Sequence, residues 1–185
     1  MDEQPSAAYM GVIHTIDWIT ENVGLGMAYI LVPVLFIPNV YEVFSRYVLK
    51  DPTIWALDVT TYAFGALFMI ASSWALLKGA HVRTDMLWDK FSHRTKGAID
   101  AGAFLFLFLP TMAVLTWTSW DDFLYSMSIN ERSNSGVWQP PIWPLRGVIP
   151  FACALLFLQG VSEFLKSLWA VRTGHLLSKQ EKFEV

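Results

Sequence analysis

Four long stretches of the chain carry no Asp, Glu, Lys or Arg. They cover residues 23–41, 59–77, 101–120 and 147–162. A hydrocarbon core about 30 Å thick needs roughly 20 apolar residues in a helix, so the first three stretches can cross a membrane unaided. The fourth is shorter and needs Leu145 and the stem of Lys166 at its ends, by snorkelling or by thinning of the bilayer. The pattern predicts four transmembrane helices.

We therefore expect an all-α integral membrane protein with one membrane domain, residues 1–185. The predicted elements are an interfacial helix at 6–21, spans at 22–47, 55–78, 95–126 and 147–171, an amphipathic helix at 81–93, a periplasmic loop at 127–146 and a cytoplasmic tail at 172–185. In the first segment, apolar residues recur at helical spacing and the acids fall elsewhere on the wheel, which is typical of a helix on the membrane surface.

The distribution of Lys and Arg predicts the orientation of the four spans. The side with the N-terminus, the central connection and the tail holds Lys78, Arg83, Lys90, Arg94, Lys96, Lys166, Arg172, Lys179 and Lys182, against four basic residues on the other side. By the positive-inside rule, both termini are cytoplasmic. The leader has no Lys or Arg and so lacks the basic region of a cleavable signal peptide, and we expect the first span to be retained.

Composition narrows the function classes. The chain is 54% hydrophobic and 16% charged, more apolar than an ordinary soluble protein. Its net charge is -3 and it has no basic tract, which argues against nucleic acid as a partner. Its one cysteine, Cys153, cannot form an intrachain disulfide, so a CxxC quinone-linked oxidoreductase is disfavoured.

The chain offers little reactive chemistry. Its histidines lie outside the apolar stretches, at His14, His81, His93 and His175, so none faces another across the hydrocarbon layer. We expect no haem, metal, other cofactor or catalytic residue. Asp58 and Glu163 are the acids nearest to the spans, and structural pairing at the interface is favoured over a proton relay. With no charge deep in its spans, the chain is expected to assist a transporter and not to conduct a solute alone.

The charged segment 81–93 has two interpretations. His81, Asp85 and Trp88 recur at i, i+4 and i+7, so a helix here would be amphipathic and lie on the cytoplasmic membrane face. It either only connects two spans, or His81, Arg83 and Asp85 form a polar contact that holds the second span against a partner. The spacing alone leaves both open.

The stretch "GAHVRTDML" resembles a G-x-H-[VI]-x-[VI]-D segment of the small membrane subunit of tripartite ATP-independent periplasmic (TRAP) transporters, the DctQ-like family. Gly79, His81, Val82 and Asp85 match, whereas Thr84 stands where an aliphatic residue is more usual.

Other segments are similar to the same family in order and spacing. "FSRYVLKDPTIWALD" resembles its Arg-Tyr at the end of the first span, followed by the Trp that begins the second, with Asp58 where Glu is more usual. "PPIWPLRGVIPFACALLFLQG" is similar to its Pro- and Trp-rich start of the fourth span. The resemblance covers about residues 22–171.

The resemblance implies a division of labour in a bacterial cell inner membrane. A periplasmic binding protein (DctP-like) captures an organic acid, and a large membrane subunit (DctM-like) carries the substrate and sodium sites and moves as an elevator. The small subunit packs beside the large one as a static scaffold, in contact with membrane lipid. Which organic acid is transported is not indicated by this chain.

On this basis two groups of contact residues are expected. Candidates for contact with the large subunit are His81, Arg83, Asp85, Trp55 and Asp58, and candidates for docking of the binding protein are Arg46, Arg132, Arg146, Trp138 and Trp143. Arg and Trp are common at interface hot spots, although Trp at this depth also belongs to the membrane belt. Small residues at Gly65, Ala66, Ser72, Ser73 and Gly160 pack either on the large subunit or within the chain's own helices.

Two alternatives remain open. A stand-alone four-span structural or assembly protein would share the composition but lack the matched segments. A membrane electron carrier would need buried ligands that the sequence does not supply.

Overall fold

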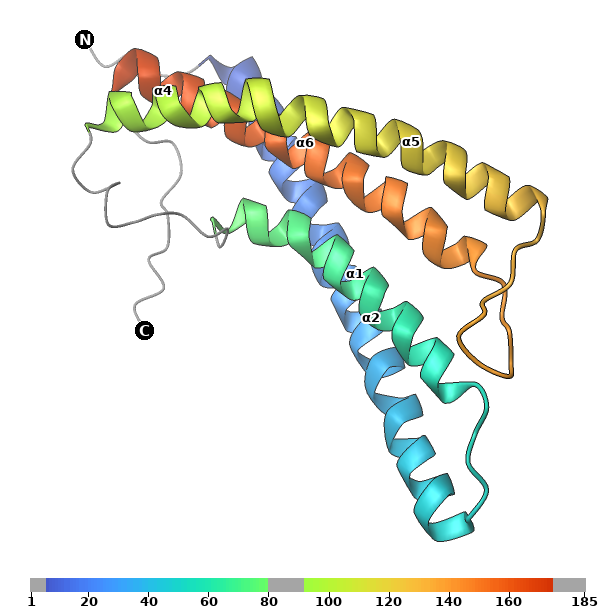
Figure 1. Ribbon diagram of the computed structural model, residues 1–185. Helices are drawn as coiled ribbons and strands as arrows, with labels where there is room; N and C mark the ends of the chain where they lie inside the picture. The colour runs from blue at the N-terminus through green and yellow to red at the C-terminus, as the bar shows by residue number, and fades with distance from the viewer. Residues whose placement is uncertain (1–5, 80–91, 175–185) are drawn as a thin grey trace. The chain divides into compact units, whose positions relative to one another are not determined.

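The computed structural model describes residues 6–79 and 92–174, and every secondary-structure element in these ranges is helical (Figure 1). The elements are α1 (Ala7–Phe44), the π-helix η1 (Ser45–Leu49), α2 (Ala56–Leu77), α4 (His93–Ala103), the π-helix η2 (Phe104–Phe108), α5 (Leu109–Ser128) and α6 (Trp143–Thr173). Four continuous helical stretches, Ala7–Leu49, Ala56–Leu77, Arg94–Ser128 and Trp143–Thr173, are long and apolar enough to cross a membrane. The predicted all-α membrane fold is confirmed.

The predicted interfacial helix, 6–21, and the predicted first span, 22–47, lie in one helix without a break (Figure 1). No proline occurs in this stretch before Pro33, and an isolated glycine costs a helix only about 1 kcal/mol relative to alanine. Nothing in the local sequence therefore forces the chain to turn near residue 22. Whether the first turns lie along the membrane surface stays a prediction.

The third predicted span contains a local change of helix type. The π-helix Phe104–Phe108 lies between α4 and α5, and the N–H of Leu109 donates to the carbonyl of Phe104. Pro110 follows at once, and a proline ring clashes with the carbonyl four residues earlier. The wider π-turn accommodates that clash, so one long helix continues through the proline.

The predicted amphipathic helix, 81–93, lies outside the described residues except at its last positions. There Ser92 accepts a hydrogen bond from the backbone N–H of Thr95 at 3.3 Å and caps the start of α4. His93 therefore begins the helix that leads into the third span.

The described chain divides into two compact units. The first contains residues 6–22, 73–79, 92–114 and 154–174, and the second contains residues 23–72 and 115–153. In the first unit, the Tyr9 hydroxyl at the start of α1 donates to the carbonyl of Leu165 on α6, and the Tyr9 ring lies 6.0 Å from that of Trp169. α6 therefore packs against the start of α1.

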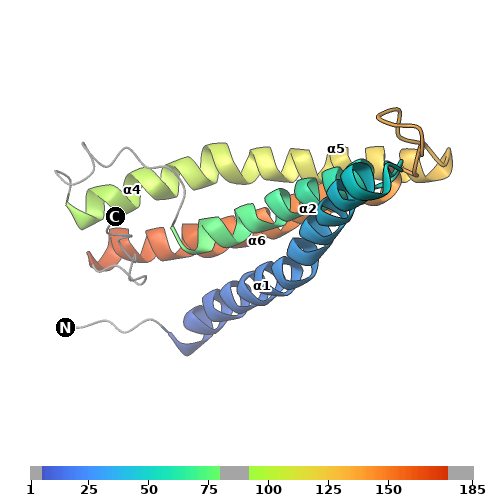
Figure 2. The same cartoon turned by 90° about the horizontal axis from the view of Figure 1, so that it is seen from below.

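On another side of α6 in the first unit lies α4, and the two helices run next to each other in both views (Figure 1, Figure 2). A Cβ placed on Gly97 would lie 2.9 Å from the carbonyl oxygen of Ser167, and one on Gly160 would lie 2.5 Å from the Phe108 ring. Glycine at these two positions allows the close packing of α6 against α4 and η2.

The second unit is built around one face of α2. Ala56, Ala63, Ala66 and Ile70 are buried and recur seven, three and four residues apart, so they share a single helix face. Phe64 and Phe68 lie on another face of α2 and are exposed. The buried stripe consists mostly of alanine, whose small side chain lets neighbouring helices approach closely.

Short backbone contacts fix the connection between α5 and α6 in the second unit. The N–H of Ser133 donates to the carbonyl of Pro140 at 2.8 Å, and that of Ile142 donates to the carbonyl of Glu131 at 2.9 Å. The loop between these residues thus has a defined base. Pro144 follows in the first turn of α6, where its missing N–H costs nothing.

Candidate functional site

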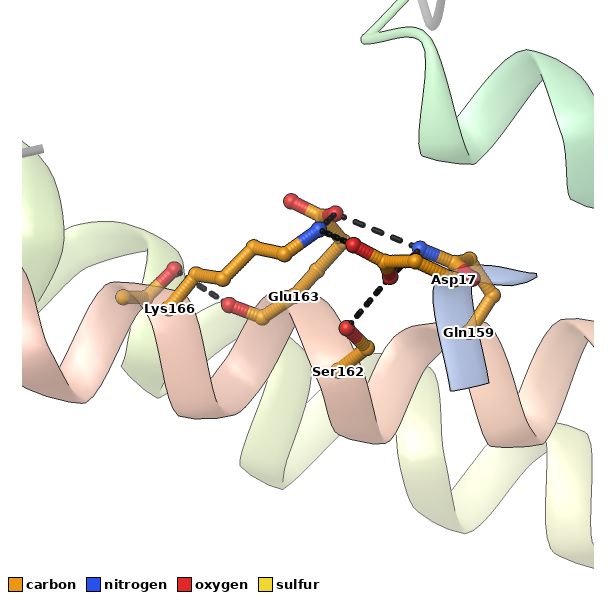
Figure 3. Close-up of polar contacts among 6 residues, drawn as sticks. Asp17, Gln159, Ser162, Glu163 and Lys166 are labelled. Carbon is orange, nitrogen blue, oxygen red and sulfur yellow. Dashed lines mark hydrogen bonds and ion pairs between the residues drawn. The ribbon is translucent and has the colours of Figure 1, made fainter. Parts of the chain in front are cut away.

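A buried polar cluster joins α1 to α6 in the first unit (Figure 3). The Lys166 ammonium lies 2.8 Å from Asp17 Oδ2 and 2.7 Å from Glu163 Oε1. Gln159 Nε2 donates to Asp17 Oδ1 at 3.1 Å and to Glu163 Oε1 at 3.3 Å, and the Ser162 hydroxyl donates to Asp17 Oδ1 at 2.7 Å. Asp17 is the one member that comes from α1.

The α6 members of this cluster share one helix face. Gln159, Ser162, Glu163 and Lys166 stand at i, i+3, i+4 and i+7, and this spacing aligns side chains along a helix. Tyr9 contacts α6 near residue 165, whereas Asp17 contacts it near residue 162. As the residue number rises along α1 it falls along α6, so the two segments are antiparallel.

Burial gives the cluster its electrostatic character. The exposed fraction of the side chain is 11% for Lys166, 13% for Glu163 and 23% for Asp17, while Gln159 and Ser162 are fully buried. Two carboxylates thus share one ammonium, and with both carboxylates ionised the cluster carries one net negative charge. Charged side chains with so little exposure to solvent are tolerated only when they are paired and hydrogen-bonded.

A second, more exposed ion pair lies nearby in the first unit. Lys78, directly after α2, is 2.8 Å from Glu21 Oε1 of α1 and lies 5.8 Å from the centre of the Trp74 ring. The Lys78 and Glu21 side chains are 35% and 43% exposed. Surface pairs of this kind contribute at most about 1 kcal/mol.

These clusters pair charges and offer no catalytic arrangement. Within residues 6–79 and 92–174 no group of three or more His, Cys, Asp or Glu side chains is placed to hold a metal ion. Glu163 is paired with Lys166, in agreement with the structural role expected for it from the sequence.

The predicted docking residues all belong to the second unit. Arg46 is exposed, and its Nε donates to Glu42 Oε1 at 2.9 Å. Arg146 lies 2.8 Å from Glu131 Oε1 and is half-buried, whereas Arg132 is exposed and donates to the carbonyl of Gln139 at 3.2 Å.

The two predicted docking tryptophans flank the same connection between α5 and α6. Trp138 is 43% exposed in the loop, and Trp143 begins α6 and is half-buried. Arg132, Arg146 and both tryptophans therefore lie in or beside one loop, whereas Arg46 lies in η1.

Glu42 connects α1 to the segment before α2. Its Oε1 binds Arg46, while its Oε2 accepts hydrogen bonds from the backbone N–H of Thr53 at 2.8 Å and from the Thr53 hydroxyl. The Glu42 carboxylate thus links the two sides of the turn between η1 and α2.

Replacing Glu42 with Gln is expected to loosen this turn, because an amide offers one acceptor oxygen where the carboxylate offers two. Limited proteolysis of the purified chain in detergent should show cleavage between residues 49 and 55 several-fold faster than in the unsubstituted chain. Asp121→Asn removes an exposed carboxylate elsewhere and serves as the control. Equal cleavage rates for the Glu42→Gln and Asp121→Asn chains would contradict the expectation.

Trp55 and Asp58, predicted as contacts with another subunit, pack within this chain. The Trp55 ring stacks on that of Tyr41 with 5.9 Å between ring centres. Asp58 is 2% exposed, and a Cβ on Gly136 would lie 3.1 Å from Asp58 Oδ2. While the loop covers it, Asp58 is not accessible to a partner.

Small residues were expected to pack either on a partner or on the chain's own helices. Most of them are covered by other side chains of this chain. Ala66 and Ser73 are buried, Gly160 packs on Phe108, and a Cβ on Gly65 would lie 3.4 Å from the Leu145 side chain. His81, Arg83 and Asp85 lie outside the described residues.

The cluster of Asp17 with Lys166 was not predicted from the sequence, which puts the acids of the first segment on the polar face of a surface helix and Lys166 at the end of the fourth span. One signal was present: four polar residues at i, i+3, i+4 and i+7, 159 to 166, occur in the C-terminal half of that span. Such a polar face usually marks a contact with another helix.

Comparisons with known proteins add the family. The sequence profile of the family described as "Tripartite ATP-independent periplasmic transporters, DctQ component" matches residues 35–169. Searches of curated proteins and of solved structures return no match. The matched region runs from the last third of α1 to the last turns of α6 and includes Glu163 and Lys166 but not Asp17. Since this region is well over half of the 185 residues, the chain belongs to the DctQ component family of the tripartite ATP-independent periplasmic transporters.

Proposed function

We propose that this small transporter subunit is a static scaffold beside a large DctM-like membrane subunit, in a sodium-coupled transporter for organic acids. In this proposal the large subunit binds the substrate and sodium and moves, while the present chain stays fixed in the membrane. The chain itself performs no catalysis and needs no cofactor.

The observation that carries the proposal is the contrast between the chain's polar groups and its apolar faces. Among the described residues, Asp17, Glu163 and Lys166 pair with one another in one compact cluster, and the buried carboxylate of Asp58 lies beneath the loop residue Gly136. The outer faces of α1 and η2 expose large apolar side chains, among them Tyr29, Phe36, Ile37, Phe106 and Leu107. Such faces meet lipid or another membrane protein.

A DctP-like binding protein is proposed to dock at the connection between α5 and α6. Trp138 and Arg132 support this proposal because both are exposed there, and these residue types are common in interface hot spots. Arg146 is already paired with Glu131, so it would support the loop more than contact the partner. The proposed orientation, in a bacterial inner membrane with cytoplasmic termini, puts this loop in the periplasm. His81, Arg83 and Asp85 are proposed to brace the large subunit from the cytoplasmic side.

Affinity purification from the native membrane tests the proposal. A tagged chain extracted in mild detergent should recover a much larger multi-span protein in a fixed ratio, whereas a tagged four-span protein of another family should not. Recovery of the chain alone, under conditions that preserve other membrane complexes, would count against the scaffold. A haem band in the visible spectrum would favour an electron carrier instead.

Transport itself gives the second measurement. Vesicles that contain both membrane subunits should take up an organic acid only when the binding protein and an inward sodium gradient are present. Uptake that persists when potassium replaces sodium would contradict the proposed coupling.

A further inference from the structure

The polar cluster of Asp17, Gln159, Ser162, Glu163 and Lys166 has more hydrogen-bond acceptors than donors. Both oxygens of Asp17 are engaged, and the contacts of the Glu163 carboxylate with the described chain all end on Oε1. Glu163 Oε2 is turned away from the other labelled side chains (Figure 3). The fully buried carbonyl oxygen of Gln159 also accepts no hydrogen bond from a described residue. Among the residues that the structure describes, the cluster therefore lacks a donor for these two oxygens.

Within the described residues the cluster also lacks a positive charge. When ionised, Asp17 and Glu163 together carry two negative charges, and Lys166 carries one positive charge. Lys78, another cation of the first unit, is paired with Glu21. An unmatched negative charge that is mostly removed from water is unfavourable, so a cationic group at Glu163 Oε2 would be strongly favoured.

The geometry favours an arginine as this cationic group. Only 13% of the Glu163 side chain is exposed, so the donor must reach a carboxylate that is largely covered by its own chain. A guanidinium supplies the charge and several N–H groups on a long stem, and it is less strongly hydrated than an ammonium. The ammonium of a phosphatidylethanolamine lipid would bring its own phosphate close to two carboxylates, which opposes binding.

The surface beside the cluster is suited to a protein partner. Trp18, next to Asp17 on α1, is 60% exposed. Consecutive residues on a helix point in different directions, so Trp18 marks an exposed apolar face of α1 next to the face that bears Asp17, and a membrane protein partner could cover it. Both residues lie in the first unit.

We infer that Glu163 receives an arginine of the large membrane subunit, whose guanidinium donates to Glu163 Oε2 and neutralises the cluster. This inference rests on the proposed function, since it takes the large subunit as the partner. Lys166 and Gln159 hold the Glu163 carboxylate in place for this contact, and Asp17 fixes Lys166.

The test measures the affinity of the purified chain for the large subunit in nanodiscs. Glu163→Gln keeps the side-chain length and removes the charge, and it is expected to weaken binding roughly 10- to 100-fold, the effect of losing one charge-assisted hydrogen bond. Asp122→Asn removes an exposed carboxylate on α5 and is expected to leave the affinity unchanged. Circular dichroism of each chain alone shows whether it is folded.

Several outcomes would overturn the inference. One is a folded Glu163→Gln chain that binds as tightly as the unsubstituted chain. Another is an equal loss of affinity in the Arg83→Gln chain, with no further loss when Arg83→Gln and Glu163→Gln are combined. This result would place the cation in this chain. A third is an affinity of the unsubstituted chain that falls by the same factor as in Glu163→Gln when phosphatidylethanolamine is left out of the nanodisc. Failure of the unsubstituted chain to bind any large subunit would instead reject the proposed function.

Selection for suppressors keeps the inference testable if the Glu163→Gln chain does not fold. Cells whose uptake is impaired by Glu163→Lys are expected to regain it through an Arg→Glu or Arg→Asp change in the large subunit. Suppressors confined to this chain would overturn the inference.

Discussion

Replacing Lys166 with Met is expected to destabilise the chain by roughly 3 kcal/mol, the lower end of the range for breaking a buried ion pair. Lys166 lies within 2.8 Å of Asp17 and Glu163, so its removal leaves two carboxylates that repel each other in a mostly dry site. The lower end applies because 23% of the Asp17 side chain remains in contact with solvent. Unfolding of the purified chain in detergent, followed by circular dichroism, measures the loss.

Two further variants make this first prediction specific. Lys78→Met breaks the more exposed pair with Glu21 and is expected to cost less than about 1 kcal/mol. Adding Asp17→Asn and Glu163→Gln to Lys166→Met neutralises the cluster and should recover most of the lost stability. If Lys166→Met and Lys78→Met destabilise the chain equally, the Lys166 cluster is no more buried than the pair of Lys78 with Glu21.

Gly97→Ala is expected to destabilise the chain by about 1–3 kcal/mol, as overpacking does in a tightly packed core. The added Cβ would lie 2.9 Å from the carbonyl oxygen of Ser167 and 3.1 Å from the backbone nitrogen of Val171. Both are main-chain atoms of α6 and cannot rotate aside, so α4 and α6 would have to separate. Loss of thermal stability in detergent is the measurement.

Gly102→Ala provides a matched control on the same helix. A Cβ at Gly102 would meet nothing within 4 Å, so the substitution should stabilise the chain by about 0.5–1 kcal/mol through the higher helix propensity of alanine. Opposite signs at two glycines five residues apart on α4 would identify the contact with α6 as the cause. Equal effects would contradict the close packing at Gly97.

Four membrane-spanning helices and the family could be predicted from the amino-acid sequence alone. The number follows from physics that acts on each segment separately, because charged groups are excluded from the hydrocarbon layer and about 20 residues are needed to cross it. The family followed from segments such as "GAHVRTDML", whose order and spacing can be read without any coordinates. Local chemistry likewise explains why the third helix changes to a π-turn before Pro110.

The tertiary structure alone decided which of these helices meet and which side chains they share. Helical spacing shows that Gln159, Glu163 and Lys166 lie on one face, but it does not identify Asp17, more than 140 residues earlier, as their partner. Asp58 likewise has the sequence environment of an accessible interface residue, and only the folded loop shows that Gly136 covers it. Segment properties depend on local hydrophobicity and hydrogen bonding, whereas contacts depend on packing between distant segments, which periodicity along the chain does not encode.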